Sequence, residues 1–170
     1  MSREPPSVIA HRNLPLLLLR AREDVIARFR PILHAHGLTE QQWRIVRALA
    51  ESEPRALEPR QICELCTLSS PSLTGVLSRM DDQGLVARRR VDTDQRRLLV
   101  SLTAKSRAIV RRIAPLVERE YRALEADVGR ELVRDAYALL DRLSAGLRAA
   151  AARARVDPLR KPSAPSRKRA

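Results

Sequence analysis

The stretch SSPSLTGVLSRMDDQG, residues 69–84, predicts the helix that decides the fold. Ser69 or Ser70 can cap its start, Pro71 suits the first turn, and Gly84 ends it. At about 100° per residue, one face is apolar and consists of Leu73, Val76, Leu77 and Met80. The outer face has mostly small side chains and consists of Pro71, Thr74, Gly75, Ser78, Arg79 and Asp82. Such a face fits the major groove of DNA, and a plain surface helix is the alternative.

The segment LVARRRVDTDQRRLLVSLT, residues 85–103, predicts a β-hairpin directly after this helix. Two runs with strand character flank the polar tip DTDQ. We expect Asp94 to hold the guanidinium of Arg96 by paired hydrogen bonds, and Asp92 to form the turn. The apolar side of the hairpin consists of Leu85, Val86, Leu98, Val100 and Leu102.

Two helices are predicted at the start of the chain. Residues 16–36 show apolar residues at helical spacing, with a kink or break expected at Pro31. Residues 39–50 begin with a capping box of Thr39 and Gln42. The inward positions of the second helix are Trp43, Val46, Leu49 and Ala50.

A short helix over residues 58–66 lies between these helices and the small-sided one. We expect Ile62, Leu65 and Leu68 to be buried there. Helix, short turn, helix and arginine-tipped hairpin is the order of a winged helix-turn-helix. Because four elements agree in order and length, an ordinary charged hairpin is the weaker interpretation.

Two long amphipathic helices follow the hairpin, the first capped by Thr103 and containing Pro115, where a kink is expected. A small winged domain does not need them for its own core, so they favour association with a second copy over a cap on a monomer. The fold class is therefore mainly α (α+β), a winged helix-turn-helix with a long helical dimerisation region. The predicted divisions are an N-terminal arm at 1–13, a helical dimerisation region at 14–38 and 103–154, a winged helix-turn-helix at 39–102, and a disordered basic tail at 155–170.

The formal net charge of +13 and the pI near 11.3 point to a polyanionic partner, either nucleic acid or an anionic membrane surface. No apolar run is long enough to span a membrane, and the N-terminus does not have the order of a secretory signal. We expect a cytoplasmic protein that is associated with the nucleoid when it is bound to DNA.

Catalytic and metal sites have little support in this sequence. No glycine-rich phosphate loop, metal-ligand cluster or nucleophile–base pair stands at a useful spacing. We expect no enzyme activity, no cofactor and no metal. Cys63 and Cys66 form CELC, which we interpret as small core residues, with an oxidation sensor as the alternative.

The order of these elements resembles the MarR family of bacterial winged-helix regulators over about residues 13 to 147. The DxR signature of the wing stands as Asp94-Gln95-Arg96, and the FRP and TEQQWRIVR segments are similar to the homoprotocatechuate-operon repressor subgroup. The chain also resembles the member of the family that is tied to nicotinate catabolism. The resemblance implies a homodimer that represses an aromatic-acid or heteroaromatic-acid catabolic operon from a pseudo-palindromic operator in double-stranded DNA. We expect no membrane partner.

The resemblance also implies which residues contact DNA. The helix in the major groove would contribute Pro71, Ser72, Thr74, Ser78 and Arg79. The wing along the minor groove would contribute Arg88, Arg90, Asp94, Arg96 and Arg97.

Members of the family bind small aromatic acids in a crevice beside the winged domain and then release DNA. We expect a hydroxyphenylacetate-like or 6-hydroxynicotinate-like ligand, with its carboxylate on Arg22 and its ring on Trp43. Phe29 shares a helical face with Arg22, seven residues earlier. The lesser candidates are His11, Arg20 and His36. In the alternative, Phe29 and Trp43 are core residues and Arg22 pairs with an acid.

A nonspecific architectural protein of the nucleoid is the competing function. It would bind any duplex with similar strength through its net charge of +13 and lose affinity steeply with salt.

Overall fold

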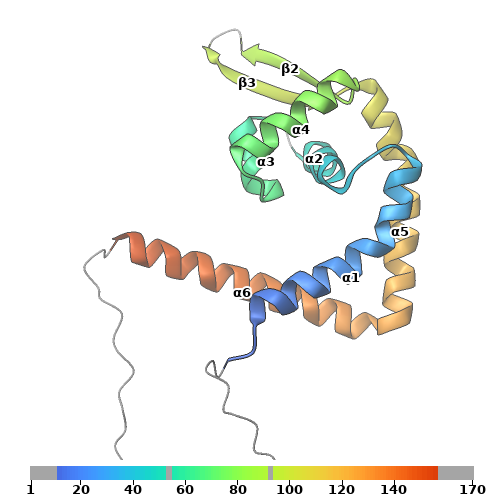
Figure 1. Ribbon diagram of the computed structural model, residues 1–170, viewed down its shortest axis with the longest axis vertical. Coiled ribbons are helices and arrows are strands. Elements are labelled where there is room, and N and C mark those ends of the chain that lie inside the picture. Colours follow the sequence, from blue (N-terminus) through green and yellow to red (C-terminus); the bar gives the residue numbers. More distant parts are fainter. Residues whose placement is uncertain (1–10, 53–54, 92–93, 157–170) are drawn as a thin grey trace, which may run out of the picture. The chain divides into compact units, whose positions relative to one another are not determined.

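The computed structural model describes residues 11–52, 55–91 and 94–156. The predicted N-terminal arm and basic tail lie mostly outside these residues, and so does Asp92. The described elements, in chain order, are α1 (Leu14–Ala35), α2 (Glu40–Glu51), β1 (Ala56–Leu57), α3 (Pro59–Cys66), α4 (Ser70–Asp82), β2 (Val86–Val91), β3 (Asp94–Leu102), α5 (Ala104–Val128) and α6 (Arg130–Val156) (Figure 1). The chain divides into two compact units, the first ending at Tyr121 and the second starting at Arg122.

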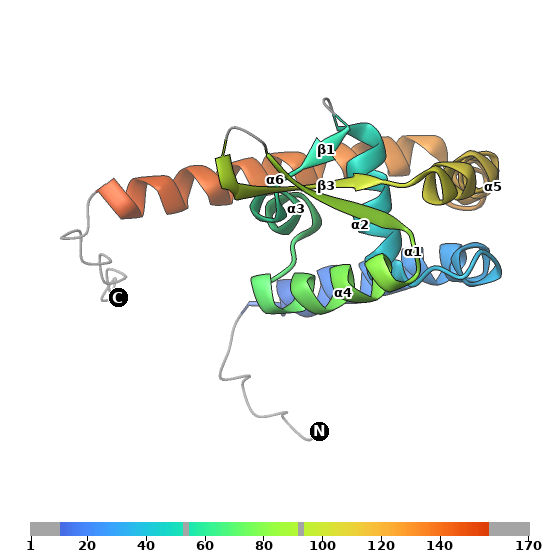
Figure 2. The same ribbon diagram turned by 90° about the horizontal axis from the view of Figure 1, so that it is seen from above.

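The first unit contains the predicted winged helix-turn-helix. The three strands form an antiparallel sheet in the order β1-β3-β2, so that β3 is the central strand (Figure 2). β2 and β3 are the two strands of the predicted hairpin, and their pairing runs from Val86 opposite Leu102 to an irregularity at Arg90 and Val91. β1 pairs with the end of β3 nearest α5, through Ala56 opposite Ser101. The predicted hairpin therefore supplies the central strand and one edge strand of a three-stranded sheet.

The five helices α1, α2, α3, α4 and α5 share one hydrophobic core with the sheet. Its fully buried members include Leu33 of α1, Ile45 and Leu49 of α2, Ile62 of α3 and Ile113 of α5. The predicted apolar face of α4 is confirmed, because all four of its residues are buried. This shared core holds α4 by one side only.

Leu65 is the clear error in the predicted core, since 63% of its surface is exposed. The residues of α3 that are buried are Ile62 and Cys66, which are four apart. Spacings of three and four are both compatible with a helical face, and periodicity alone did not distinguish between them on an eight-residue helix.

The ends of the helices follow local capping chemistry. Asn13 accepts a hydrogen bond from the Leu16 amide, and α1 consequently begins at Leu14, two residues before the predicted start. Thr103 caps α5 through the Ser106 amide, as predicted. Pro31 lies inside α1 without breaking it.

The capping box of α2 also connects two helices. The Thr39 hydroxyl accepts from the Gln42 amide at 3.2 Å, and the Gln42 side-chain oxygen accepts from the Thr39 amide at 2.9 Å. The side-chain nitrogen of Gln42 donates to the side-chain oxygen of Gln83 at 2.8 Å. Gln83 caps the C-terminus of α4. The almost fully buried Gln42 therefore ties the start of α2 to the end of α4.

Replacing Gln42 by Ala should lower the free energy of unfolding by about 1 to 3 kcal/mol, because it removes the capping box and the bond to Gln83. Urea unfolding at a fixed protein concentration measures this change. Gln41→Ala is the matched control, since Gln41 is exposed on the same turn, and should change stability by less than about 0.5 kcal/mol. Equal losses in the two variants would contradict the role given to Gln42.

Candidate nucleic-acid interface and effector site

The outer face of α4 is free of core contacts. The predicted DNA-contacting residues of this helix are all exposed, namely Pro71, Ser72, Thr74, Ser78 and Arg79. The Thr74 hydroxyl donates to the Ser70 carbonyl at 3.0 Å, and the Ser69 hydroxyl donates to the Ser72 hydroxyl at 2.9 Å. Their small side chains are thus held close to the helix, which leaves a narrow ridge that a DNA groove can accept.

Asp94 organises the start of β3 in a different way from the predicted one. Its carboxylate accepts a hydrogen bond from the backbone amide of Arg96 at 3.0 Å, where paired bonds to the Arg96 guanidinium were expected. A short acidic side chain that bonds two residues ahead along its own backbone is a common turn device. Asp94 therefore shapes the backbone from which the exposed side chain of Arg96 extends.

The predicted wing arginines Arg97 and Arg88 form ion pairs within the first unit. The guanidinium of Arg97 donates to one carboxylate oxygen of Glu58 through Nε at 2.8 Å and Nη2 at 2.5 Å. These bonds raise the pKa of Arg97. Arg88 pairs with Asp81 at the end of α4, at 3.2 Å. Arg90 is exposed on β2.

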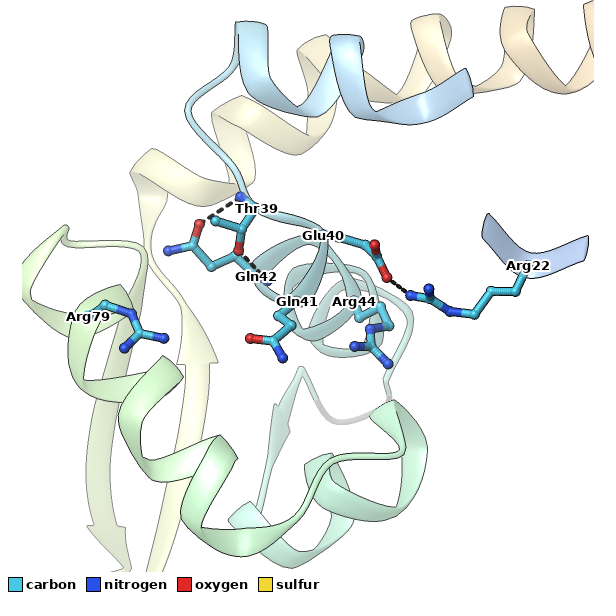
Figure 3. A pocket seen from close by; sticks show the side chains of 7 residues that line it. All are labelled: Arg22, Thr39, Glu40, Gln41, Gln42, Arg44 and Arg79. Atoms are coloured by element: carbon cyan, nitrogen blue, oxygen red, sulfur yellow. Dashed lines mark hydrogen bonds and ion pairs between the residues drawn. The ribbon is translucent and has the colours of Figure 1, made fainter. Parts of the chain in front are cut away.

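A polar cavity of about 380 Å³ lies between α2 and α4 and reaches Arg22 of α1 (Figure 3). It is lined by Arg22, Thr39, Glu40, Gln41, Gln42, Arg44 and Arg79. Among the described residues that line it, Glu40 has the one carboxylate, and this group pairs with Arg22 and also with Arg30 at 3.6 Å. Both arginines pair in addition with Glu23, so α1 and α2 are connected by a network of four alternating charges.

Of the predicted effector residues, the polar cavity contains only Arg22. Phe29 is buried, with its ring centroid 4.8 Å from that of Tyr121, and Trp43 is half-buried at the edge of the core. Arg22 lines the polar cavity without either aromatic residue. Of the lesser candidates, His11 and Arg20 are exposed, and His36 bonds through Nδ1 to the Ile32 carbonyl at 2.8 Å.

The structure adds a second cation near the aromatic residues. Arg47 follows Trp43 by one turn of α2 and bonds to Glu51 at 2.7 Å. The hydrogen bond with Glu51, and a further one with Tyr121, raise the pKa of Arg47, against the opposing effect of burial. The spacing of four between Trp43 and Arg47 was the one sequence signal for this arrangement, because Tyr121 comes from α5.

Other sites receive no support in the part of the chain that the structure describes. Cys66 is buried and Cys63 half-buried, and burial raises the pKa of the Cys66 thiol, which disfavours the reactive thiolate. No three described His, Cys, Asp or Glu side chains gather in a metal-binding group. None of the described helices has the length and apolar character needed to cross a bilayer.

The chain is similar to known proteins in sequence and in fold. The family model described as MarR family matches residues 36–97. The chain is 42% identical over 131 residues to the homoprotocatechuate degradative operon repressor of Escherichia coli, which covers 77% of this chain and 87% of that protein.

Among the solved structures with similar folds are those of NadR and BpsR. NadR in complex with 4-hydroxyphenylacetate gives a TM-score of 0.69 at 37% identity, covering 82% of this chain and 97% of NadR. BpsR of Bordetella bronchiseptica, whose DNA binding is regulated by 6-hydroxynicotinic acid, gives 0.67 at 25% identity, covering 82% and 98%. The predicted winged helix fold is confirmed.

Arg96 and Arg97 provide a matched test of the wing, because they are adjacent and exposed. Arg96→Ala should weaken binding to any duplex and reduce the slope of log affinity against log salt by about 0.9, the value for one phosphate contact. Arg97→Ala should change this slope less, since Glu58 already neutralises that guanidinium. Fluorescence anisotropy with a random duplex at several salt concentrations measures both slopes. Equal changes in the two variants would show that the Glu58 pair does not withhold Arg97 from DNA.

Proposed function

The chain belongs to the MarR family of transcription regulators, and from this premise we propose that it is a homodimeric repressor of an aromatic-acid catabolic operon. The observation that carries the proposal is the division of α4 into one fully buried apolar face and one exposed, small-sided face. The core fixes the orientation of such a helix, and its outer face remains available for base edges in a major groove. The exposed wing residue Arg96 suits the adjacent minor groove.

A second copy of the chain is the partner we propose for the helical segments 14–38 and 103–154. No side chain of α6 is buried among the described residues. Its exposed apolar residues include Leu132, Tyr137, Leu139, Leu140 and Leu147, and α1 exposes Leu14 and Leu16 to Leu19. Surfaces of this kind are usually covered by another protein. A two-fold dimer would set its recognition helices about 34 Å apart, one turn of DNA, and match a pseudo-palindromic operator.

The ligand we propose is a small hydroxylated aromatic acid. Two similar proteins are linked to such acids: NadR forms a complex with 4-hydroxyphenylacetate, and 6-hydroxynicotinic acid regulates the DNA binding of BpsR. In this chain the aromatic side chains Trp43 and Tyr121 and the cation Arg47 suit a ring with a carboxylate, and Arg22 is the other candidate cation. The ligand releases DNA only as far as it favours the dimer form that fits the operator poorly. A coupling of about 1 to 3 kcal/mol suffices for a useful response.

We propose a regulator without catalytic activity that works in the cytoplasm. The competing function, a nonspecific architectural protein, would rest on the net charge of +13. The similarity to an operon repressor over 77% of the chain favours the specific regulator.

Competition between the upstream region of the protein's own gene and a random duplex tests this function. At about 150 mM salt, we expect the upstream region to bind about 10³-fold more tightly or better, as specific sites do. Equal affinities for the two duplexes would support the architectural protein instead.

The carboxylate clamp is tested with Arg22→Ala and Arg47→Ala in parallel. Neither arginine belongs to α4 or to the wing, because Arg22 lies on α1 and Arg47 on α2, so both variants should still bind operator DNA. The variant that lacks the clamp should need at least about tenfold more aromatic acid to release the operator, because a charged hydrogen bond contributes about 1.5 to 3 kcal/mol. Gel-shift titration with 4-hydroxyphenylacetate and 6-hydroxynicotinate gives the release concentrations. Release at the wild-type concentration in both variants would contradict a clamp at either arginine.

A further inference from the structure

The polar cavity between α2 and α4 has the chemistry of an anion site. Three guanidiniums line it, from Arg22, Arg44 and Arg79, against the single carboxylate of Glu40. That carboxylate is already paired with Arg22 and with Arg30 of α1. Its charge is thereby neutralised within the protein, which leaves Arg44 and Arg79 as an excess of positive charge around the cavity.

The lining also indicates which kind of anion fits. All seven described lining residues have polar or charged side chains, and none of them is aromatic. Pockets for aromatic acids are lined mainly by apolar side chains around a few polar groups. A compact, strongly hydrated anion such as a phosphate group is better suited to this cavity than the proposed aromatic effector.

The position of Arg79 on α4 connects the cavity to DNA. Arg79 lies five residues after Thr74, which places the two side chains about 140° apart around the helix axis. In Figure 3 the guanidinium of Arg79 extends from α4 toward the first turn of α2, where Gln41 lies. Arg79 therefore borders the outer face of α4 on its α2 side, where a DNA strand that flanks an occupied groove would pass.

Arg44 is held in place for such a contact. Its Nη1 donates to the carbonyl of Cys66, at the end of α3, at 2.9 Å. This bond connects α2 to α3 and restricts the side chain, so less conformational entropy is lost when an anion binds. Gln41, exposed beside it, adds an amide donor.

We propose that this cavity takes a phosphate of the DNA backbone, with Arg79 and Arg44 as its cationic ligands, so that Arg79 is a backbone contact and does not read a base. The inference rests on the proposed function, because DNA is the ligand. It assigns sequence recognition to the small side chains of α4.

Arg79→Ala tests the site by its salt dependence. We expect the variant to lose affinity for the upstream region and for a random duplex by the same factor, with both salt slopes reduced by about 0.9. Arg112→Ala is the control, because it removes one exposed arginine from α5, outside the cavity, and should leave the slopes unchanged. Arg79→Lys keeps a charge for the phosphate and should largely restore the slope. Thermal melting of each variant verifies that the fold is intact.

Three results would overturn the proposal. A slope equal to the wild-type value in Arg79→Ala would show that no phosphate is bound there. A loss confined to the upstream region, or altered preference among upstream duplexes with single base-pair changes, would make Arg79 a base reader. A shift in the aromatic-acid release concentration with unchanged slopes would assign the cavity to the effector. The random-duplex slope tests the site even if the wild-type protein shows no preference for its upstream region, so the two proposals fail separately.

Discussion

The burial of one face of α4 is the constraint on which the rest of the structure depends. Leu73, Val76, Leu77 and Met80 lie in the same core as the central residues of α1, α2 and α3, so this helix cannot rotate without opening that core. The hydrogen bond between Gln42 and Gln83 fixes its far end. A helix that must present a thin ridge to a partner needs this support on the opposite side, because small side chains cannot adjust to a misplaced backbone.

The charges of the chain are more ordered than the excess of 33 basic over 20 acidic residues suggests. Asp81 and Glu58 each pair with an arginine that leads into or out of the wing, and Glu23 and Glu40 pair with two arginines of α1. These carboxylates hold the arginine side chains in fixed positions as well as neutralising their charge. Positive charge that is fixed in space can select a register on DNA, whereas mobile charge would only increase nonspecific attraction.

Features set by neighbouring residues were predictable from the sequence. The capping box at Thr39, the apolar face of α4 and the hairpin all follow from local chemistry and periodicity, and the structure contains each of them. The contacts that the sequence did not predict join distant segments. Glu58 and Arg97 are 39 residues apart, and Arg47 meets Tyr121 across an even longer separation. Leu65 was misplaced because a short helix permits more than one buried face.

The exposed apolar stripe of α6 has a consequence for how this protein responds to its own abundance. In the proposed dimer, the 27-residue helix α6, none of whose described side chains is buried, acquires its core from the partner, so folding of this region and association form one equilibrium. Dilution then weakens the fold itself as well as the occupancy of DNA. A substitution in α6 therefore changes first the protein concentration that is needed to form the ordered dimer. A DNA affinity measured far above that concentration does not reveal the effect of the substitution.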